Sequence, residues 1–195
     1  MVTTDIIKEL RDRTGVSVMQ CKKALEEAGG DMEKAIVILQ KKGADSAAKK
    51  LDRTLGAGVI QAYVHSTGTA GALVELACET DFVSKNPEFK ALAYDIAMHI
   101  VASRPQFLKK EDINEDARRV AEEVFAEEVQ GKPEAMKAKI LEGKLAAYFG
   151  ERILLDQPFI KNPEVTIGAL VGSAVQKFGE KVELVRFVRF GVLEK

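Results

Sequence analysis

The chain has 195 residues, of which 46% are hydrophobic and 30% are charged, the mixture typical of a soluble globular protein. Its 29 basic and 30 acidic residues leave a formal net charge of −1, which argues against general coating of nucleic acid. Cys21 and Cys78 lie in no CxxC pair, so neither a disulfide framework nor a zinc site is expected. No stretch reaches the roughly 20 apolar residues that span a bilayer, and no signal peptide is evident, so we expect a reducing cytoplasm and no membrane partner.

Two short helices are predicted first. Thr3 or Thr4 is a suitable cap for the first helix, which ends at Gly15. The second helix opens with a capping box, in which Ser17 accepts a backbone N–H and the Gln20 side chain reaches back.

A third helix is predicted after the cap residue Asp31, ending at Gly43. Three helices within residues 1–50 predict a tight N-terminal bundle. Residues 41–58 are basic, rich in alanine and punctuated by glycine, which indicates a partly helical linker and a domain boundary. The second domain is expected to span residues 51–195.

Alternation of apolar and polar residues predicts three strands, over residues 59–65, 72–79 and 181–192. The residues expected to share a face are Ile60, Ala62 and Val64 in the first strand, Val74, Leu76 and Cys78 in the second, and Val182, Leu184, Val188 and Phe190 in the third. Because helices separate the strands, we predict an α+β domain with a small three-stranded antiparallel sheet packed on helices.

The remaining helices follow from caps and apolar spacing. Asn86 caps one helix, and Thr166 caps another. Residues 114–130 and 133–148 form two amphipathic helices joined by a short turn. We therefore expect a helical hairpin, inserted at about residues 112–150.

No catalytic constellation stands out. His65 and His99 are the only histidines, and without further ligands they indicate structural or surface roles. The glycines of residues 56–58 precede a strand, the reverse of a dinucleotide fingerprint, so no nucleotide binding is expected. A hydrolase using Asp81 with Glu79 or His65 is one alternative function. An RNA-binding module using the basic linker is another, although a solvated linker explains those charges more simply.

One loop favours a binding role. Thr80, Asp81, Phe82 and Val83 lie between a strand and the Asn86 cap, so Asp81 and Phe82 are expected near the surface at the junction of two rigid elements. Phe82 could fold back into the core. It could equally act as a wedge that enters an apolar slot of a partner while the carboxylate perturbs the charge there. The residues alone leave both interpretations open.

Two motifs resemble the bacterial elongation factor Ts family. The first runs through residues 10–15 and 21–25, and the second through residues 75–83. Shorter matches at residues 131–133, 142–144, 157–159 and 186–190 follow in the same order, so the resemblance covers essentially the whole chain. The family commonly has asparagine where this chain has Ala77, which puts the local hydrogen bonding behind the loop in question.

The resemblance implies a ubiquitin-associated-like N-terminal domain, a core domain and a helical hairpin. It implies a non-enzymatic guanine nucleotide exchange factor that binds elongation factor Tu–GDP and needs no cofactor. Thr80–Val83 corresponds to the segment that intrudes beside the Mg²⁺ site of elongation factor Tu. Val18 and Met19, with Arg11, correspond to a patch that contacts its GTP-binding domain.

Long members of the family carry a duplicated core, for which this chain is too short. We therefore expect two copies to pair across exposed sheet surfaces, forming a homodimer that replaces the missing half. The near-neutral charge leads us to expect no direct binding of nucleic acid. An RNA- or ribosome-associated binding module remains the alternative to the exchange factor.

Overall fold

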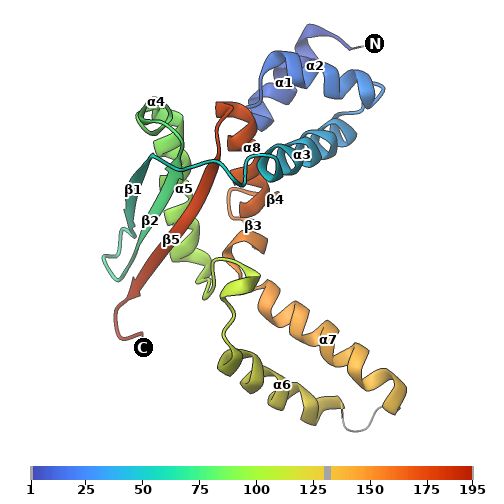
Figure 1. Ribbon diagram of the computed structural model, residues 1–195, viewed down its shortest axis with the longest axis vertical. Coiled ribbons are helices and arrows are strands. Elements are labelled where there is room, and N and C mark those ends of the chain that lie inside the picture. The colour runs from blue at the N-terminus through green and yellow to red at the C-terminus, as the bar shows by residue number, and fades with distance from the viewer. Residues whose placement is uncertain (1, 130–132, 195) are drawn as a thin grey trace.

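A computed structural model describes residues 2–129 and 133–194 (Figure 1). The α-helices are α1 (Thr4–Thr14), α2 (Val18–Glu27), α3 (Met32–Ala48), α4 (Asp81–Ser84), α5 (Pro87–Ser103), α6 (Glu115–Val129), α7 (Glu134–Gly150) and α8 (Ile167–Phe178). The 3-10 helices are η1 (Lys110–Asp112) and η2 (Leu154–Asp156). The strands are β1 (Ala57–Val64), β2 (Ala70–Cys78), β3 (Pro158–Phe159), β4 (Asn162–Thr166) and β5 (Val182–Gly191).

Two antiparallel sheets are present in the described part of the chain. The larger has the strand order β1-β2-β5, and the smaller pairs β3 with β4. The predicted α+β class and three-stranded antiparallel sheet are confirmed. The β3–β4 pair was not predicted, because its strands are too short to show an alternating pattern.

The three N-terminal helices begin where the sequence predicts them to begin. Side-chain oxygens of Thr3, Ser17 and Asp31 each accept the backbone N–H three residues later, at 3.4, 3.4 and 3.0 Å. Gly15 ends α1 with a φ of +67°, a conformation that glycine adopts without strain. The capping box on α2 is only half made, because the Gln20 side-chain oxygen is buried and has no hydrogen-bond partner within the described residues.

The predicted end of α3 at Gly43 is wrong. α3 continues to Ala48 and packs against α8. A Cβ at Gly43 would lie 3.2 Å from the carbonyl oxygen of Gly172, so glycine here permits a close approach of two helices. The first half of the predicted linker is therefore helical, whereas the division into domains at residue 50 stays a prediction.

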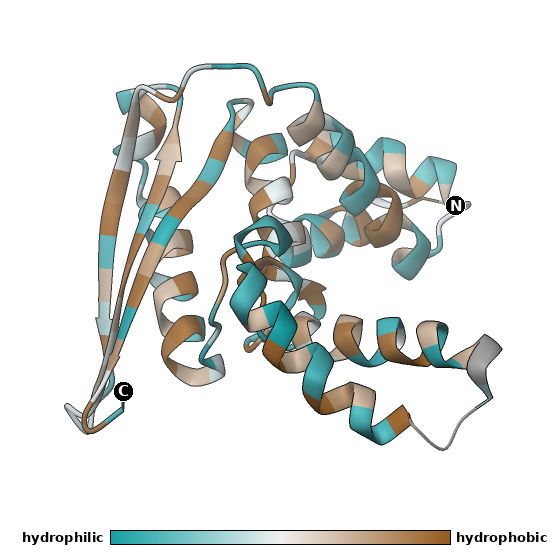
Figure 2. Ribbon diagram, turned by 60° about the horizontal axis from the view of Figure 1, so that its bottom comes forward, coloured by the Kyte–Doolittle hydropathy of each residue, from teal (hydrophilic) through white to brown (hydrophobic). Residues whose placement is uncertain are grey.

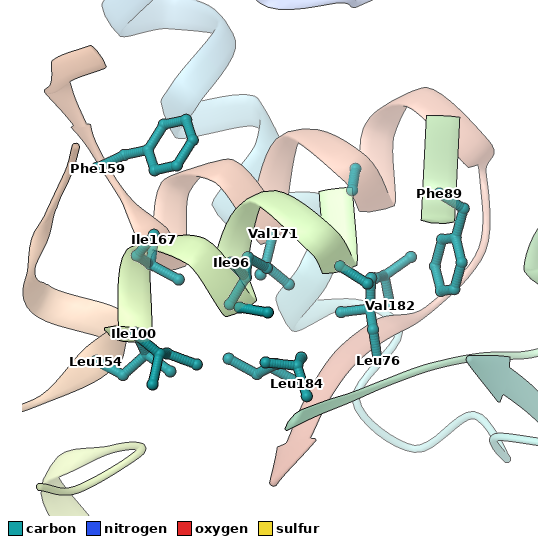
Figure 3. Packing of buried hydrophobic residues seen from close by; sticks show 14 of the residues in the cluster. Leu76, Phe89, Ile96, Ile100, Leu154, Phe159, Ile167, Val171, Val182 and Leu184 are labelled. Carbon is teal, nitrogen blue, oxygen red and sulfur yellow. The ribbon is translucent and has the colours of Figure 1, made fainter. Parts of the chain in front are cut away.

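The main core lies between one face of the larger sheet and the helices α5 and α8 (Figure 3). Leu76 and Leu184 project from the sheet into this core, and Ile96 of α5 and Ile167 of α8 belong to the same cluster. Burying each such side chain contributes about 1.5–3 kcal/mol, so this contact is the main source of stability for the sheet.

A β-bulge reverses the predicted alternation in β5. Leu76 pairs with Leu184 and Glu75 pairs with Arg186, which leaves Val185 as an extra residue. Val182 and Leu184 are buried as predicted, but Val188 and Phe190 are exposed, at 40% and 67%. The prediction that all four residues share a face is wrong, because one extra residue moves every later side chain to the other face.

The predicted helical hairpin is present as α6 and α7, which extend away from the sheet (Figure 1). Ala121, Phe149 and Ile153 form a small buried cluster at its base. Residues 130–132, which include most of the predicted turn, lie outside the described residues.

Candidate partner-binding site

α4 is a single helical turn between the end of β2 and the start of α5 (Figure 1). Phe82 is 81% exposed, and Asp81 beside it is also exposed. Val83, the next residue, is 3% exposed and packs in the main core. The alternative in which Phe82 folds back into the core is wrong, because it is Val83 that anchors the turn there.

Hydrogen bonds fix the backbone of this turn. The Thr80 N–H and hydroxyl donate to the two carboxylate oxygens of Glu180, at 3.0 and 2.6 Å. The Ser84 hydroxyl donates to the Asp81 carbonyl oxygen at 3.1 Å, and the Cys78 thiol donates to the Thr80 carbonyl oxygen at 3.2 Å. Burial raises the pKa of the Cys78 thiol, so the thiol stays protonated and keeps its donor at neutral pH.

Asp81 carries a charge partner on its own helix. Its carboxylate lies 2.5 Å from the Lys85 ammonium, and both side chains are largely exposed. The hydrogen bond and the charge of Lys85 lower the pKa of Asp81, so the carboxyl is ionised at neutral pH. The i,i+4 spacing of an acid and a base could have revealed Lys85 in the sequence.

Glu79 has a structural role beside the turn. Its carboxylate accepts the Lys181 backbone N–H at 2.5 Å and the Arg53 guanidinium at 3.1 Å. These donors, the Lys181 N–H first, lower the pKa of Glu79. Neither Lys181 nor Glu180 was predicted, because each lies about a hundred residues from its partner and no local pattern marks such a contact.

Asp81 and His65, one of the two pairs in the hydrolase hypothesis, lie far apart. His65 follows β1 at the hairpin turn, where its Nδ1 lies 2.9 Å from the Thr67 hydroxyl. Asp81 follows β2 at the other end of the hairpin, about 25 Å away along eight paired residues. His99 is buried and bonded to Gln157 at 2.9 Å. Within residues 2–129 and 133–194, no three histidine, cysteine or acidic side chains gather around one metal position.

The residues predicted to form an N-terminal patch are exposed. Val18 and Met19 occupy the first turn of α2 and are 51% and 66% exposed, and Arg11 is exposed near the end of α1. α1, α2 and α4 lie at the same end of the long axis, and the α6–α7 hairpin lies at the other (Figure 1). A single partner that spans this end could contact both α2 and α4.

The basic linker is partly engaged within the chain. Lys42 pairs with Glu27 at 2.6 Å, Lys50 donates to the Val175 carbonyl oxygen at 3.5 Å, and Arg53 pairs with Glu79. These contacts leave fewer cations of the segment for phosphate groups than the RNA-binding hypothesis assumed.

One face of the larger sheet points away from the helices, and we call it the outer sheet face (Figure 2). Its exposed members come from all three strands: Ile60, Val64, Leu73, Val188 and Phe190. Glu75 and Arg186 lie on the same face and pair with each other at 2.5 Å. Ile60, Ala62 and Val64 thus share a face as predicted, and it is the exposed face.

Ala77, where the resemblance implies asparagine, is only 7% exposed on β2. Its register partners are Gly58 and Glu183. A methyl group there packs without needing a hydrogen-bond partner.

Among residues 2–129 and 133–194, none of the helices has the length and hydrophobicity required to span a bilayer.

Comparison with known proteins assigns the chain to a family. A family profile described as "Elongation factor TS" matches residues 4–194. Elongation factor Ts of Carboxydothermus hydrogenoformans is 48% identical over 97% of this chain and 88% of its own length. The protein of that name from Thermodesulfovibrio yellowstonii is 48% identical over 98% of this chain and 96% of its own length. Elongation factor Ts of Thermosipho melanesiensis is 45% identical over the full length of both chains.

An exposed aromatic side chain at the tip of α4 and exposed apolar side chains at the start of α2 are features typical of a protein-binding factor. The family match shows this factor to be a translation elongation factor. The chain belongs to the elongation factor Ts family, the guanine nucleotide exchange factors of elongation factor Tu.

Proposed function

We propose that the chain promotes GDP release by inserting the tip of α4 beside the Mg²⁺ and phosphate site of elongation factor Tu. Asp81 and Phe82 make the contact, and Thr80 and Val83 hold them in place. The observation that carries the proposal is that Phe82 is 81% exposed on a turn whose two neighbours are fixed, Thr80 by Glu180 and Val83 by the core. A large apolar side chain held rigidly in water is typical of an interface anchor.

The mechanism needs no covalent step. A GTPase holds GDP through its phosphates and a bound Mg²⁺ that offsets their charge. An inserted ring displaces groups around the metal, and the Asp81 carboxylate adds negative charge there. Both effects raise the free energy of the GDP-bound state. Coupling between the two binding events is reciprocal. If the exchange protein weakens GDP binding by a given ratio, GDP weakens binding of the exchange protein by the same ratio.

The exposed start of α2 supplies affinity in this proposal. Val18 and Met19 present apolar surface and Arg11 a positive charge at the same end of the molecule as α4 (Figure 1). We therefore propose that these residues dock on the GTP-binding domain. Removing them weakens the complex, whereas removing the tip slows GDP release within the complex.

Release of fluorescent GDP from elongation factor Tu tests the proposal. Phe82→Ala is expected to lose about 2–4 kcal/mol of interaction at an interface anchor, and release slows accordingly. Met136→Ala is the matched control, because Met136 is 54% exposed on α7 in the hairpin at the opposite end of the molecule. Equal release rates for wild type and Phe82→Ala would overturn the proposal.

We further propose that two copies pair through the outer sheet face. Five large apolar side chains are exposed there, and the acidic side chains on this face are paired, Glu75 with Arg186 and Glu183 with Lys181, so two like faces do not repel. A face that is apolar and neutral can pack on its own copy about a two-fold axis, as two sheets do in a sandwich. This homodimer would act in the cytoplasm with elongation factor Tu.

Light scattering of the purified protein tests the pairing. Wild type is expected to be dimeric, and Leu73→Glu to be monomeric because it places an unpaired charge in the centre of the outer sheet face. Val37→Glu, at a 62% exposed position on α3, is the control and is expected to remain dimeric. A stable wild-type monomer at working concentration would reject the pairing.

A further inference from the structure

Glu180 lies in the short connection between α8 and β5. Gly179 ends α8 with a φ of +73°, and Glu180 follows it directly. The Glu180 side chain is half-buried, and it reaches across to the end of β2, a hundred residues earlier in the chain.

Both oxygens of the Glu180 carboxylate bind one residue. The Oε2 atom accepts the Thr80 N–H at 3.0 Å, and the Oε1 atom accepts the Thr80 hydroxyl at 2.6 Å. A charged acceptor makes such bonds about twice as strong as neutral ones. Thr80 is thereby held at its backbone and at its side chain.

Thr80 is the N-cap residue of α4, yet its hydroxyl makes no capping bond to the helix. A threonine at this position normally accepts a backbone N–H of the first turn. Here the hydroxyl donates to Glu180 instead. The residue that begins the tip is therefore tied to the α8–β5 connection and not to α4 itself.

A second bond runs in the opposite direction. The Glu79 carboxylate accepts the Lys181 N–H at 2.5 Å. Two consecutive residues of the first segment, Glu79 and Thr80, thus exchange hydrogen bonds with two consecutive residues of the other, Glu180 and Lys181. This exchange extends the β2–β5 pairing, whose last pair is Cys78 with Val182.

We propose that Glu180 is a positioning residue, which fixes the direction in which α4 presents Phe82 by holding Thr80 through both carboxylate oxygens. The inference rests on the proposed role of the tip. Glu180 lies outside the α4 turn and acts only through Thr80. Loss of the contact between Glu180 and Thr80 leaves the Phe82 side chain unchanged but lets the start of α4 move.

The test measures the rate of GDP release from elongation factor Tu at increasing concentrations of this protein. It yields two quantities, the maximal rate and the protein concentration that gives half of the maximal rate. Glu180→Gln keeps the shape and loses the charge, and Thr80→Val loses the hydroxyl. Each is expected to lower the maximal rate about 10- to 100-fold, the cost of misplacing a contact by about 1 Å. The half-maximal concentration changes little, because the N-terminal docking surface is intact.

The double variant shows whether both residues act through one contact. Glu180→Gln combined with Thr80→Val is expected to lose less than the sum of the two single losses, because both changes act on the same contact between the Thr80 hydroxyl and the Glu180 carboxylate. Thr80→Ser retains the hydroxyl and is expected to release GDP faster than Thr80→Val. Glu183→Gln removes a nearby exposed carboxylate on β5 and is the matched control. Additive losses in the double variant would overturn the proposal.

A readout without the partner completes the test. A fluorinated phenylalanine at position 82 is expected to give one sharp ¹⁹F signal in wild type and a shifted or broadened signal in Glu180→Gln. Should Glu180→Gln fail to fold, Thr80→Val tests the same contact. If Phe82→Ala slows release while Glu180→Gln and Thr80→Val do not, the tip keeps its role and the positioning role is wrong. If Phe82→Ala has no effect, the role of the tip itself is wrong.

Discussion

The Asp81 carboxylate lies 2.5 Å from the Lys85 ammonium on the solvent side of α4. Phe82 sits between them in sequence, so the proposed wedge carries an aromatic ring beside an ion pair. In the free protein the pair neutralises the tip, and the hydrogen bond and charge of Lys85 lower the pKa of Asp81 further below neutral pH. The net charge of the tip is thus set by the Asp81–Lys85 pair.

Replacing Lys85 tests its effect on the pKa of Asp81 directly. In Lys85→Gln the pKa of Asp81 is expected to rise towards its usual value, because the amide offers a weaker hydrogen bond and no charge. Titration of the Asp81 carboxyl carbon by NMR measures the change. Lys22→Gln, which breaks the exposed i,i+4 pair of Lys22 with Glu26 on α2, should leave the Asp81 titration unmoved. An unchanged Asp81 titration in Lys85→Gln would show that Lys85 does not set the pKa.

Phe82 and Val83 are adjacent, but truncation is expected to change the stability of the protein at Val83 and hardly at Phe82. Phe82→Ala removes a side chain that is 81% exposed, so the free energy of unfolding should change by about 0.5 kcal/mol or less. Val83→Ala removes buried methyl groups and should cost about 1–3 kcal/mol. Urea unfolding measures both. A large loss of stability in Phe82→Ala would mean that the ring packs against the protein in solution.

Short sequence patterns correctly predicted where several of the helices begin. The caps at Thr3, Ser17, Asn86 and Thr166 each depend on one side chain and a backbone N–H two or three residues later, so the pattern is complete within one turn. The motif at Thr80–Val83 was equally visible, because it lies in one short stretch between two clear elements.

What the sequence could not reveal depends on distant contacts. The extra residue in β5 appears only when Leu184 and Arg186 are aligned with β2, and it decides which side of the sheet Phe190 faces. The support of Thr80 by Glu180 joins residues a hundred positions apart. Gly43 looked like a helix end because a glycine that ends a helix and one that admits a neighbouring helix look identical in sequence.

The crossing of α3 and α8 gives a paired prediction. A Cβ at Gly172 would meet its nearest atom at 3.6 Å, an ordinary contact, so Gly172→Ala should gain about 0.5–1 kcal/mol from helix propensity. A Cβ at Gly43 would lie 3.2 Å from a backbone oxygen, which cannot rotate away as a side chain can. Gly43→Ala should therefore be less stable than wild type. Thermal unfolding ranks the three proteins, and a gain in Gly43→Ala would show that the helices can separate at no cost.

His99 links α5 to the chain that follows the helical hairpin. Its Nε2 lies 2.9 Å from the Gln157 side-chain oxygen, and its Nδ1 accepts the Ile160 N–H at 3.4 Å. These partners assign the proton of the neutral ring to Nε2. A second proton on Nδ1 would face the Ile160 donor. Burial lowers the pKa of His99, so the folded protein resists its protonation.

The stability of the protein should therefore fall as the pH falls. Unfolded His99 titrates near its usual pKa of about 6.5, and folded His99 titrates lower, so between these values the unfolded state binds more protons. The stabilising contribution of neutral His99 is complete above the pKa that His99 has in the unfolded state. It is lost as the pH falls through the lower pKa of His99 in the folded state. Urea unfolding at pH 8, 7, 6 and 5 should show a steeper decline for wild type than for His99→Gln, with His65→Gln as the control for removing a histidine. Parallel curves for wild type and His99→Gln would show that His99 is not the group responsible.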